Sequence, residues 1–239
     1  MSRHILTIAL LISAALSSWA DVMNHDKMFR AYIAGDMDTW GVEIKRATAL
    51  PLSVEEKLEV LNYLYGYVPT IVEIKEKRGE AKYYIDLMKD YIEEVEEAGL
   101  APALCMVYRV SMLSAQISLN SLSMMTLGPQ CLSLTNKALK LEPDNPLTLG
   151  LKGNTLFYAP GMFGGNKREA LDFYLKSLDA FRHEANPLYK WNEAGMLFCI
   201  AEAYEKVVSP EKAAGYCREI LKAYPDFTMV KNFLSNLEQ

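Results

Sequence analysis

Beyond residue 20, apolar residues recur mainly three, four or seven positions apart, and almost no stretch alternates strictly between apolar and polar residues. The first spacing is typical of helices that bury one face, whereas strict alternation is typical of strands. Proline, glycine and Asn/Asp clusters break the pattern into segments of helical length. The pattern predicts five helical hairpins and a final helix, at residues 22–34, 36–48, 53–76, 79–97, 101–121, 128–141, 146–158, 167–183, 189–207, 210–223 and 227–237.

The clearest repeating unit is LFCIAEAYEKVVSPEKAAGYCREILKAYP, residues 197–225. Its small residues Ala201 and Ala213 would let two antiparallel helices approach closely, and Tyr204 would fill the space beside them. Pro225 would end the second helix, because proline lacks the backbone donor that a further turn needs. The unit therefore predicts a tightly packed helical hairpin.

Earlier segments fit the same register less regularly. Ala170 and Tyr174 take the corresponding positions of the preceding second helix, and Ala138 keeps the small position in ALKLEPDNP. Gly153 matches Ala201 if the extra residues PGMFG lie in the turn. No flexible Gly/Ser-rich or Pro-rich linker interrupts the array, so residues 21–239 are predicted to form a single domain.

The glycine-rich turn after Pro160 has two interpretations, a phosphate-binding loop or a corner between helices. A phosphate loop of the GxxxxGK[ST] type needs Lys directly after Gly, followed by Ser or Thr. Here Lys167 follows Asn166. Asn166 is instead placed to cap the next helix, with Glu169 three residues later, which completes a capping pattern. We therefore expect a corner.

These features together resemble the tetratricopeptide-repeat superfamily. Residues 53–183 are similar to a group of exported bacterial repeat proteins, on the segments LEVLNYLYGYV (58–68), GPQCLSLTNKALKLEPDNP (128–146) and LKGNTLFYAPGMFGGNKREALDFYLKSL (151–178). The resemblance implies an all-helical, right-handed solenoid that binds a protein or peptide on its concave face. It brings no catalytic residues. By the family's register, the concave face would carry Thr70, Glu73, Asn154, Phe157, Phe198, Glu202 and Glu205.

The chain has 239 residues, of which 51% are hydrophobic and 23% charged, with a formal net charge of −5. This composition is globular, and the length allows a substantial core. An acidic protein without clustered Lys and Arg is a poor candidate for binding nucleic acid or anionic lipid.

The first 20 residues have the pattern of a signal peptide. A short basic region precedes an apolar run, and the small residues Ser18 and Ala20 suit a cleavage site after Ala20. An uncleaved anchor is the alternative. No later segment is apolar and long enough to cross a membrane, so we expect an exported, periplasmic or extracellular protein without membrane insertion.

The remaining candidate chemistry is sparse. The four cysteines, Cys105, Cys131, Cys199 and Cys217, lie on apolar stripes and are interpreted as buried thiols, with disulfides left open. His25 and His183 belong to no metal-binding pattern, and no metal or cofactor is expected. Met124 and Met125 are expected to fill an irregular helix junction, or else to form an adaptable binding surface.

The sequence hypothesis is therefore a non-enzymatic binding module of the cell envelope with a protein or peptide partner. The alternative is a structural accessory subunit of an envelope or transport complex. An enzyme is disfavoured, because only the abundant carboxylates point to one.

Overall fold

The computed structural model describes residues 22–184 and 186–239, so the predicted signal peptide lies outside the described residues. Within these ranges the regular structure is helical. It consists of α2 (His25–Ala34), α3 (Met37–Thr48), α4 (Val54–Val72), α5 (Arg78–Glu97), α6 (Pro102–Leu119), α7 (Met124–Leu141), α8 (Pro146–Tyr158), α9 (Lys167–His183), α10 (Lys190–Val207), α11 (Pro210–Ala223) and α12 (Thr228–Leu237), with four short 3₁₀ helices, η1 (Lys75–Lys77), η2 (Ser121–Ser123), η3 (Gly161–Phe163) and η4 (Pro187–Tyr189). The prediction of an all-helical chain is confirmed.

Helix starts follow the local capping chemistry of the sequence. The Ser53 side chain accepts the backbone N–H of Glu56, and the Glu56 carboxylate accepts the backbone N–H of Ser53, which forms a complete capping box. At the end of α2, Gly35 adopts a left-handed conformation (φ 72°) that glycine takes without strain. These short-range signals explain why most predicted helix ends agree with the structure.

The start of α7 differs from the prediction. The helix begins at Met124 and continues through Pro129, which lies in its second turn. Proline there removes one backbone hydrogen bond without ending the helix. Met124 and Met125 therefore do not fill a junction: their side chains are 39% and 73% exposed.

The glycine-rich turn forms the expected corner. Gly164 has a left-handed backbone (φ 85°), and a Cβ on Gly165 would overlap the Ala159 carbonyl oxygen. The Asn166 backbone N–H donates to the Leu156 carbonyl at 2.9 Å, and the Asn166 side chain accepts the backbone N–H of Glu169. Packing and capping therefore account for Gly164, Gly165 and Asn166 of this turn.

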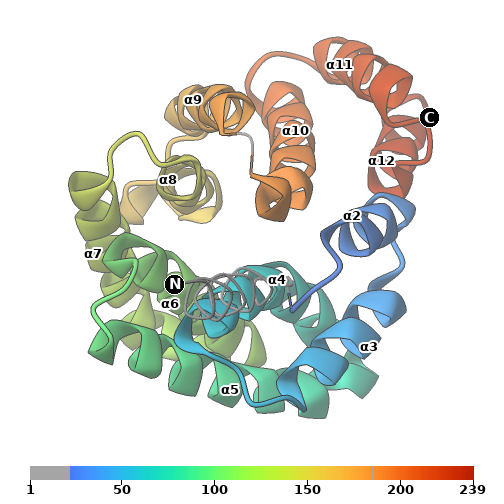
Figure 1. Cartoon of the computed structure of the whole chain (residues 1–239). Helices are drawn as coiled ribbons and strands as arrows, with labels where there is room; N and C mark the ends of the chain where they lie inside the picture. The colour runs from blue at the N-terminus through green and yellow to red at the C-terminus, as the bar shows by residue number, and fades with distance from the viewer. Residues whose placement is uncertain (1–21, 185) are drawn as a thin grey trace, which may run out of the picture.

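Consecutive helices pack in pairs (α2–α3, α4–α5, α6–α7, α8–α9 and α10–α11), and α12 follows. Figure 1 shows that the pairs follow a curve around a central space and that α12 arrives beside α2. No helix in the described ranges has both the length and the hydrophobicity to span a bilayer.

The small residues predicted at the helix contacts are buried. The alanines at these positions are 0% exposed, and the Tyr174 ring packs directly against Gly153 on the adjoining helix. Tyr204 is half-buried, with its ring 5.2 Å from that of Tyr216. The fully buried alanines are Ala138, Ala170, Ala201 and Ala213.

The two ends of the described chain meet. The Thr228 hydroxyl at the start of α12 donates to the Ala34 carbonyl at 2.9 Å, although 194 positions separate the two residues. From α2, the Tyr32 ring contacts Phe227 and Trp191, with centroids 5.7 and 5.5 Å away. The array of helix pairs therefore closes on itself rather than remaining open.

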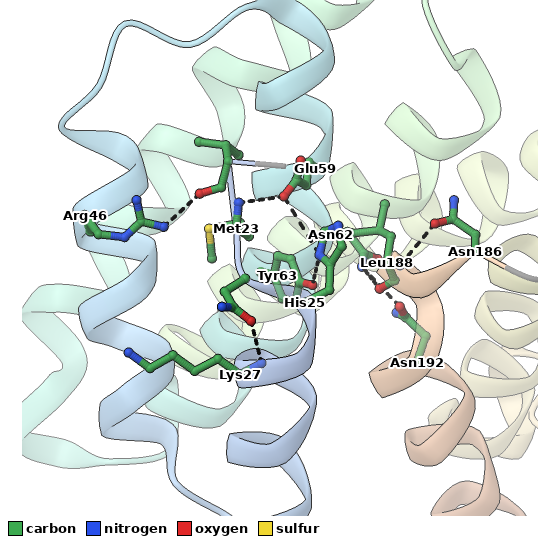
Figure 2. A network of polar contacts seen from close by, with 12 residues as sticks. Met23, His25, Lys27, Arg46, Glu59, Asn62, Tyr63, Asn186, Leu188 and Asn192 are labelled. Carbon is green, nitrogen blue, oxygen red and sulfur yellow. Dashed lines mark hydrogen bonds and ion pairs between the residues drawn. The ribbon is translucent and has the colours of Figure 1, made fainter. Parts of the chain in front are cut away.

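A buried polar contact joins α4 to α10 across the ring. The side chain of Asn62 is 0% exposed, and its Nδ2 donates to the Leu188 carbonyl at 3.3 Å and to Oδ1 of Asn192 at 3.1 Å. Figure 2 shows Asn62 facing Leu188 and Asn192, which lie together on one side of it. Because an unpaired buried amide is costly, this contact fixes how the first helices sit against α10.

Candidate functional site

The concave side of the ring encloses a cavity of about 850 Å³. Four inner helices, α4, α6, α8 and α10, provide most of its wall, and the first half of α7 completes it. Figure 1 shows these inner helices around the central space. Because each helix pair contributes its first helix, the cavity follows directly from the repeated packing.

Five of the residues predicted on the concave face line this cavity: Thr70, Glu73, Asn154, Phe198 and Glu202. They come from α4, α8, α10 and the residue that follows α4. The structure therefore brings together side chains that lie far apart in the sequence. Their role in binding stays a prediction.

The other two predicted residues lie outside the lining. Phe157 is only 7% exposed, and its ring packs against Tyr158 and Tyr174 at centroid distances of 4.9 and 6.0 Å. Glu205 forms an ion pair with Lys206 at 3.0 Å. Both stand one turn beyond a lining residue, where the helix face has rotated away from the cavity.

Alignment to the repeat pattern did not identify several residues that line the cavity. Helix α6 contributes a stripe from Val110 to Ser118, but this segment carries none of the small or aromatic signals used to align the other units. Met124 and Met125 also line the cavity. Their adjacency was the only sequence signal, and it favoured a binding surface only as the second interpretation.

An aromatic cluster forms one part of the wall around Trp191. Its ring centroid lies 5.1 Å from that of Trp40 and 6.0 Å from that of Tyr65. The Nε1–H of Trp40 donates to the Met28 carbonyl at 2.8 Å. By contrast, Nε1 of Trp191 and Nδ2 of Asn192 are buried without an acceptor among the described residues.

The charged side chains of the lining are both acidic. They are Glu73 and Glu202, and the described lining holds no Lys, Arg or His. Burial raises the pKa of the Glu202 carboxyl above its usual range, and the nearby charge of Glu205 raises it further. The Tyr158 hydroxyl and Lys206 act in the opposite direction.

Two cysteines also line the cavity, and all four cysteines are unpaired. Burial, together with the charge of Glu202, raises the pKa of the Cys199 thiol to about 12, and burial raises the pKa of Cys131. A thiol is a nucleophile only as the thiolate. At neutral pH these two side chains therefore act as apolar wall.

His25 and His183, the histidines among the described residues, lie outside the cavity lining. The His25 ring lies on α2, with Nδ1 2.6 Å from the Tyr63 hydroxyl, and the exposed His183 faces the Asp179 carbonyl of its own helix. Among the described residues, no group of three or more His, Cys, Asp or Glu side chains is arranged to hold a metal ion.

Comparisons with known proteins give one informative structural result. No protein-family model matches the chain, and no curated protein matches it. Among solved structures, the HusA haemophore from Porphyromonas gingivalis is similar, with a TM-score of 0.61 and 20% sequence identity over 80% of this chain and 95% of that one. At this identity the likeness concerns the fold: the chain shares the helical arrangement of a haemophore.

Proposed function

We propose that this chain is a non-enzymatic binding protein of the bacterial cell envelope that holds a large, mainly apolar ligand in its concave cavity. The proposal includes export through the N-terminal signal peptide and an irregular, right-handed solenoid of the tetratricopeptide type. The observation that carries it is the cavity of about 850 Å³, within the range of about 300–1,000 Å³ typical of small-molecule sites.

The closed ring favours a compact ligand over a long extended peptide. In an open solenoid, a peptide can run along the concave surface and leave at either end. Here α2 packs against both α10 and α12, so a peptide on the concave surface could not leave between the two ends of the array. A compact molecule is enclosed on several sides, so its apolar surface is removed from water and contributes to binding.

Haem is the first ligand to test, because the structural neighbour is called a haemophore. The cavity suits its flat apolar ring, and Tyr158 offers a hydroxyl of the type that can ligate haem iron. Its two carboxylates find no Lys, Arg or His in the described lining, so they would have to face solvent at the cavity mouth. The residues therefore fit haem in part.

Titration of the mature protein with the apolar fluorophore N-phenyl-1-naphthylamine, and separately with haemin, tests the proposal. We expect saturable binding of at least one probe at one site per chain. Ser114→Trp should weaken it markedly, because Ser114 is exposed and lines the cavity, so an indole there takes up part of the space that the probe occupies. Ser235→Trp, on the exposed face of α12, is the matched control. Equal binding by both variants would refute a cavity site.

A second candidate is a protein or peptide partner at the rim of the cavity. Leu122 in η2 and Met125 in the first turn of α7 are 83% and 73% exposed, and Tyr158 is 66% exposed on α8. Exposed apolar side chains of this size often mark interaction sites. Crosslinking in envelope fractions with a photoreactive residue at position 122 would capture such a partner, and Met229 on α12 offers a comparison position inside the ring.

A further inference from the structure

The charged residues that line the cavity are of one sign, since the described lining holds two acidic side chains and no basic one. Some acidic side chains elsewhere are paired with bases, as Glu43 is with Lys27 at 2.6 Å. Among the described residues, Glu202 has no ion pair, because the neighbouring Lys206 pairs with Glu205. Glu73, the other acid of the lining, has none either. The described lining therefore holds acidic side chains that no basic side chain contacts within ion-pair distance.

Aromatic rings surround Glu202. Phe198 lies one turn earlier on the same helix and also lines the cavity, and the Tyr158 hydroxyl of α8 faces the Glu202 carboxyl. The charge of Glu202 also raises the pKa of Tyr32, whose ring packs against Trp191 of the same helix as Glu202. Aromatic faces attract cations, so the rings and the carboxylate favour the same kind of ligand group.

A second observation points independently to a ligand in this wall. The indole of Trp191 and the amide of Asn192 are 6% and 5% exposed, and each has a buried N–H without an acceptor among the described residues. The Asn192 amide cannot simply be turned over, because its Oδ1 accepts from Asn62, whose own Nδ2 also donates to the Leu188 carbonyl. An acceptor oxygen on a ligand would pair with such donors.

The two donors alone would suit a carboxylate as well as a carbonyl or hydroxyl. The charges decide between these, since the Coulomb interaction reaches further than a hydrogen bond and is weakly screened inside a cavity. Glu73 and Glu202 both repel an anion, and no cationic residue of the described lining offsets them. The acceptor oxygen is therefore a neutral one.

We propose that Glu202 is the charge-selecting residue of the cavity and that the ligand is a large apolar molecule with a cationic nitrogen, rather than an organic anion. Glu202 supplies the counter-ion of that nitrogen, and the Trp191–Asn192 donors take a neutral oxygen. Eleven positions along α10 separate Trp191 from Glu202, about 16 Å at the helical rise, so the two polar groups of the ligand lie at opposite ends of a molecule that still fits inside the cavity. This inference rests on the proposed function, because it assigns the chemistry of the same site.

Displacement of bound N-phenyl-1-naphthylamine tests the charge preference. The two competitors, dodecyltrimethylammonium and dodecanoate, share the same alkyl chain and are used below their micelle concentrations at pH 7. In the wild-type protein the cation should displace the probe at about tenfold lower concentration than the anion, as a charge-assisted contact predicts. Equal displacement, or a preference for dodecanoate, would overturn the inference.

Two variants assign the preference to one side chain. Glu202→Gln should bring the two competitors close to parity, each compared with the affinity that the neutral probe has for the same variant. Glu219→Gln removes the charge of an exposed carboxylate on α11, outside the lining, and should retain the preference. A preference that survives in Glu202→Gln would show that another group selects the charge.

The wild-type comparison decides the sign of the preference even if Glu202→Gln does not fold. An error in the proposed function would give a different result from an error in the charge preference. In that case the neutral probe would not bind at all, or it would bind Ser114→Trp as well as it binds the wild-type protein.

Discussion

Gly66→Ala probes the contact that closes the ring. A Cβ on Gly66 would lie 2.7 and 2.8 Å from two carbons of the Trp191 ring and 2.8 Å from a carbon of the Trp40 ring. Trp40 is 0% and Trp191 6% exposed. Neither indole can move aside cheaply, because each is packed against other rings of the aromatic cluster.

The expected magnitude is a difference between two opposing terms. Overpacking a well-filled core costs about 1–3 kcal/mol, and two rigid rings place this site near the upper end. Replacing glycine by alanine inside a helix contributes about 1 kcal/mol of stability. The net prediction is a loss of about 2 kcal/mol in the free energy of unfolding, or a melting temperature lower by about 4–8 °C for a chain of this size.

Urea unfolding monitored by far-UV circular dichroism measures this change. Gly215→Ala is the matched control: Gly215 also lies inside a helix, α11, but a Cβ there would meet no atom within 4 Å. It should stabilise the protein by about 0.5–1 kcal/mol. If Gly66→Ala were stabilising to a similar degree, the close approach of α4 to the two indoles would be wrong.

Three further predictions concern other parts of the chain. Asn62→Leu leaves the partly buried Leu188 carbonyl without its donor and should lower the unfolding free energy by about 1–3 kcal/mol; an unchanged urea midpoint would contradict the α4–α10 contact. The hydrogen bond between Glu43 and Lys27 lowers the pKa of the Glu43 carboxyl in the folded protein. The ionised carboxylate therefore stabilises the fold at pH values above the pKa that Glu43 has in the unfolded chain. This stabilisation is lost as the pH falls through the lower pKa of the folded state. Glu43→Gln should therefore melt earlier than wild type at pH 7 but not below about pH 3, which thermal scans across pH can check. Mass spectrometry of the exported protein should find an N-terminus directly after Ala20, and an intact leader would refute the predicted cleavage.

The sequence was sufficient for the helices because their determinants are local. The capping box of Ser53 and Glu56 and the left-handed Gly35 act within a few residues. Alignment of the small residues to the repeat pattern also predicted seven concave positions, and five of these residues line the cavity. Phe157 is the informative exception. It shares the spacing, but its ring packs onto Tyr174 of the neighbouring helix α9, so its side chain does not line the cavity. The sequence of α8 alone does not show where the neighbouring helix packs.

The closure of the ring could not be predicted. It depends on contacts such as Asn62 with Asn192, 130 positions apart, and no spacing rule links residues at that distance. The charge of the cavity could not be predicted either. Glu202 is one of thirty acidic residues, and its isolation becomes visible only when the four inner helices are assembled.

The meeting of α2 and α12 has a consequence for how this architecture can change over time. Open helical-repeat arrays tolerate the gain or loss of a whole unit, because each unit touches only its neighbours and the ends carry special polar caps. Here the last helix covers the first, so each end serves as the cap of the other. Duplication or deletion of a helix pair would prevent the ends from meeting, which restricts variation in this lineage to substitutions within a fixed number of units.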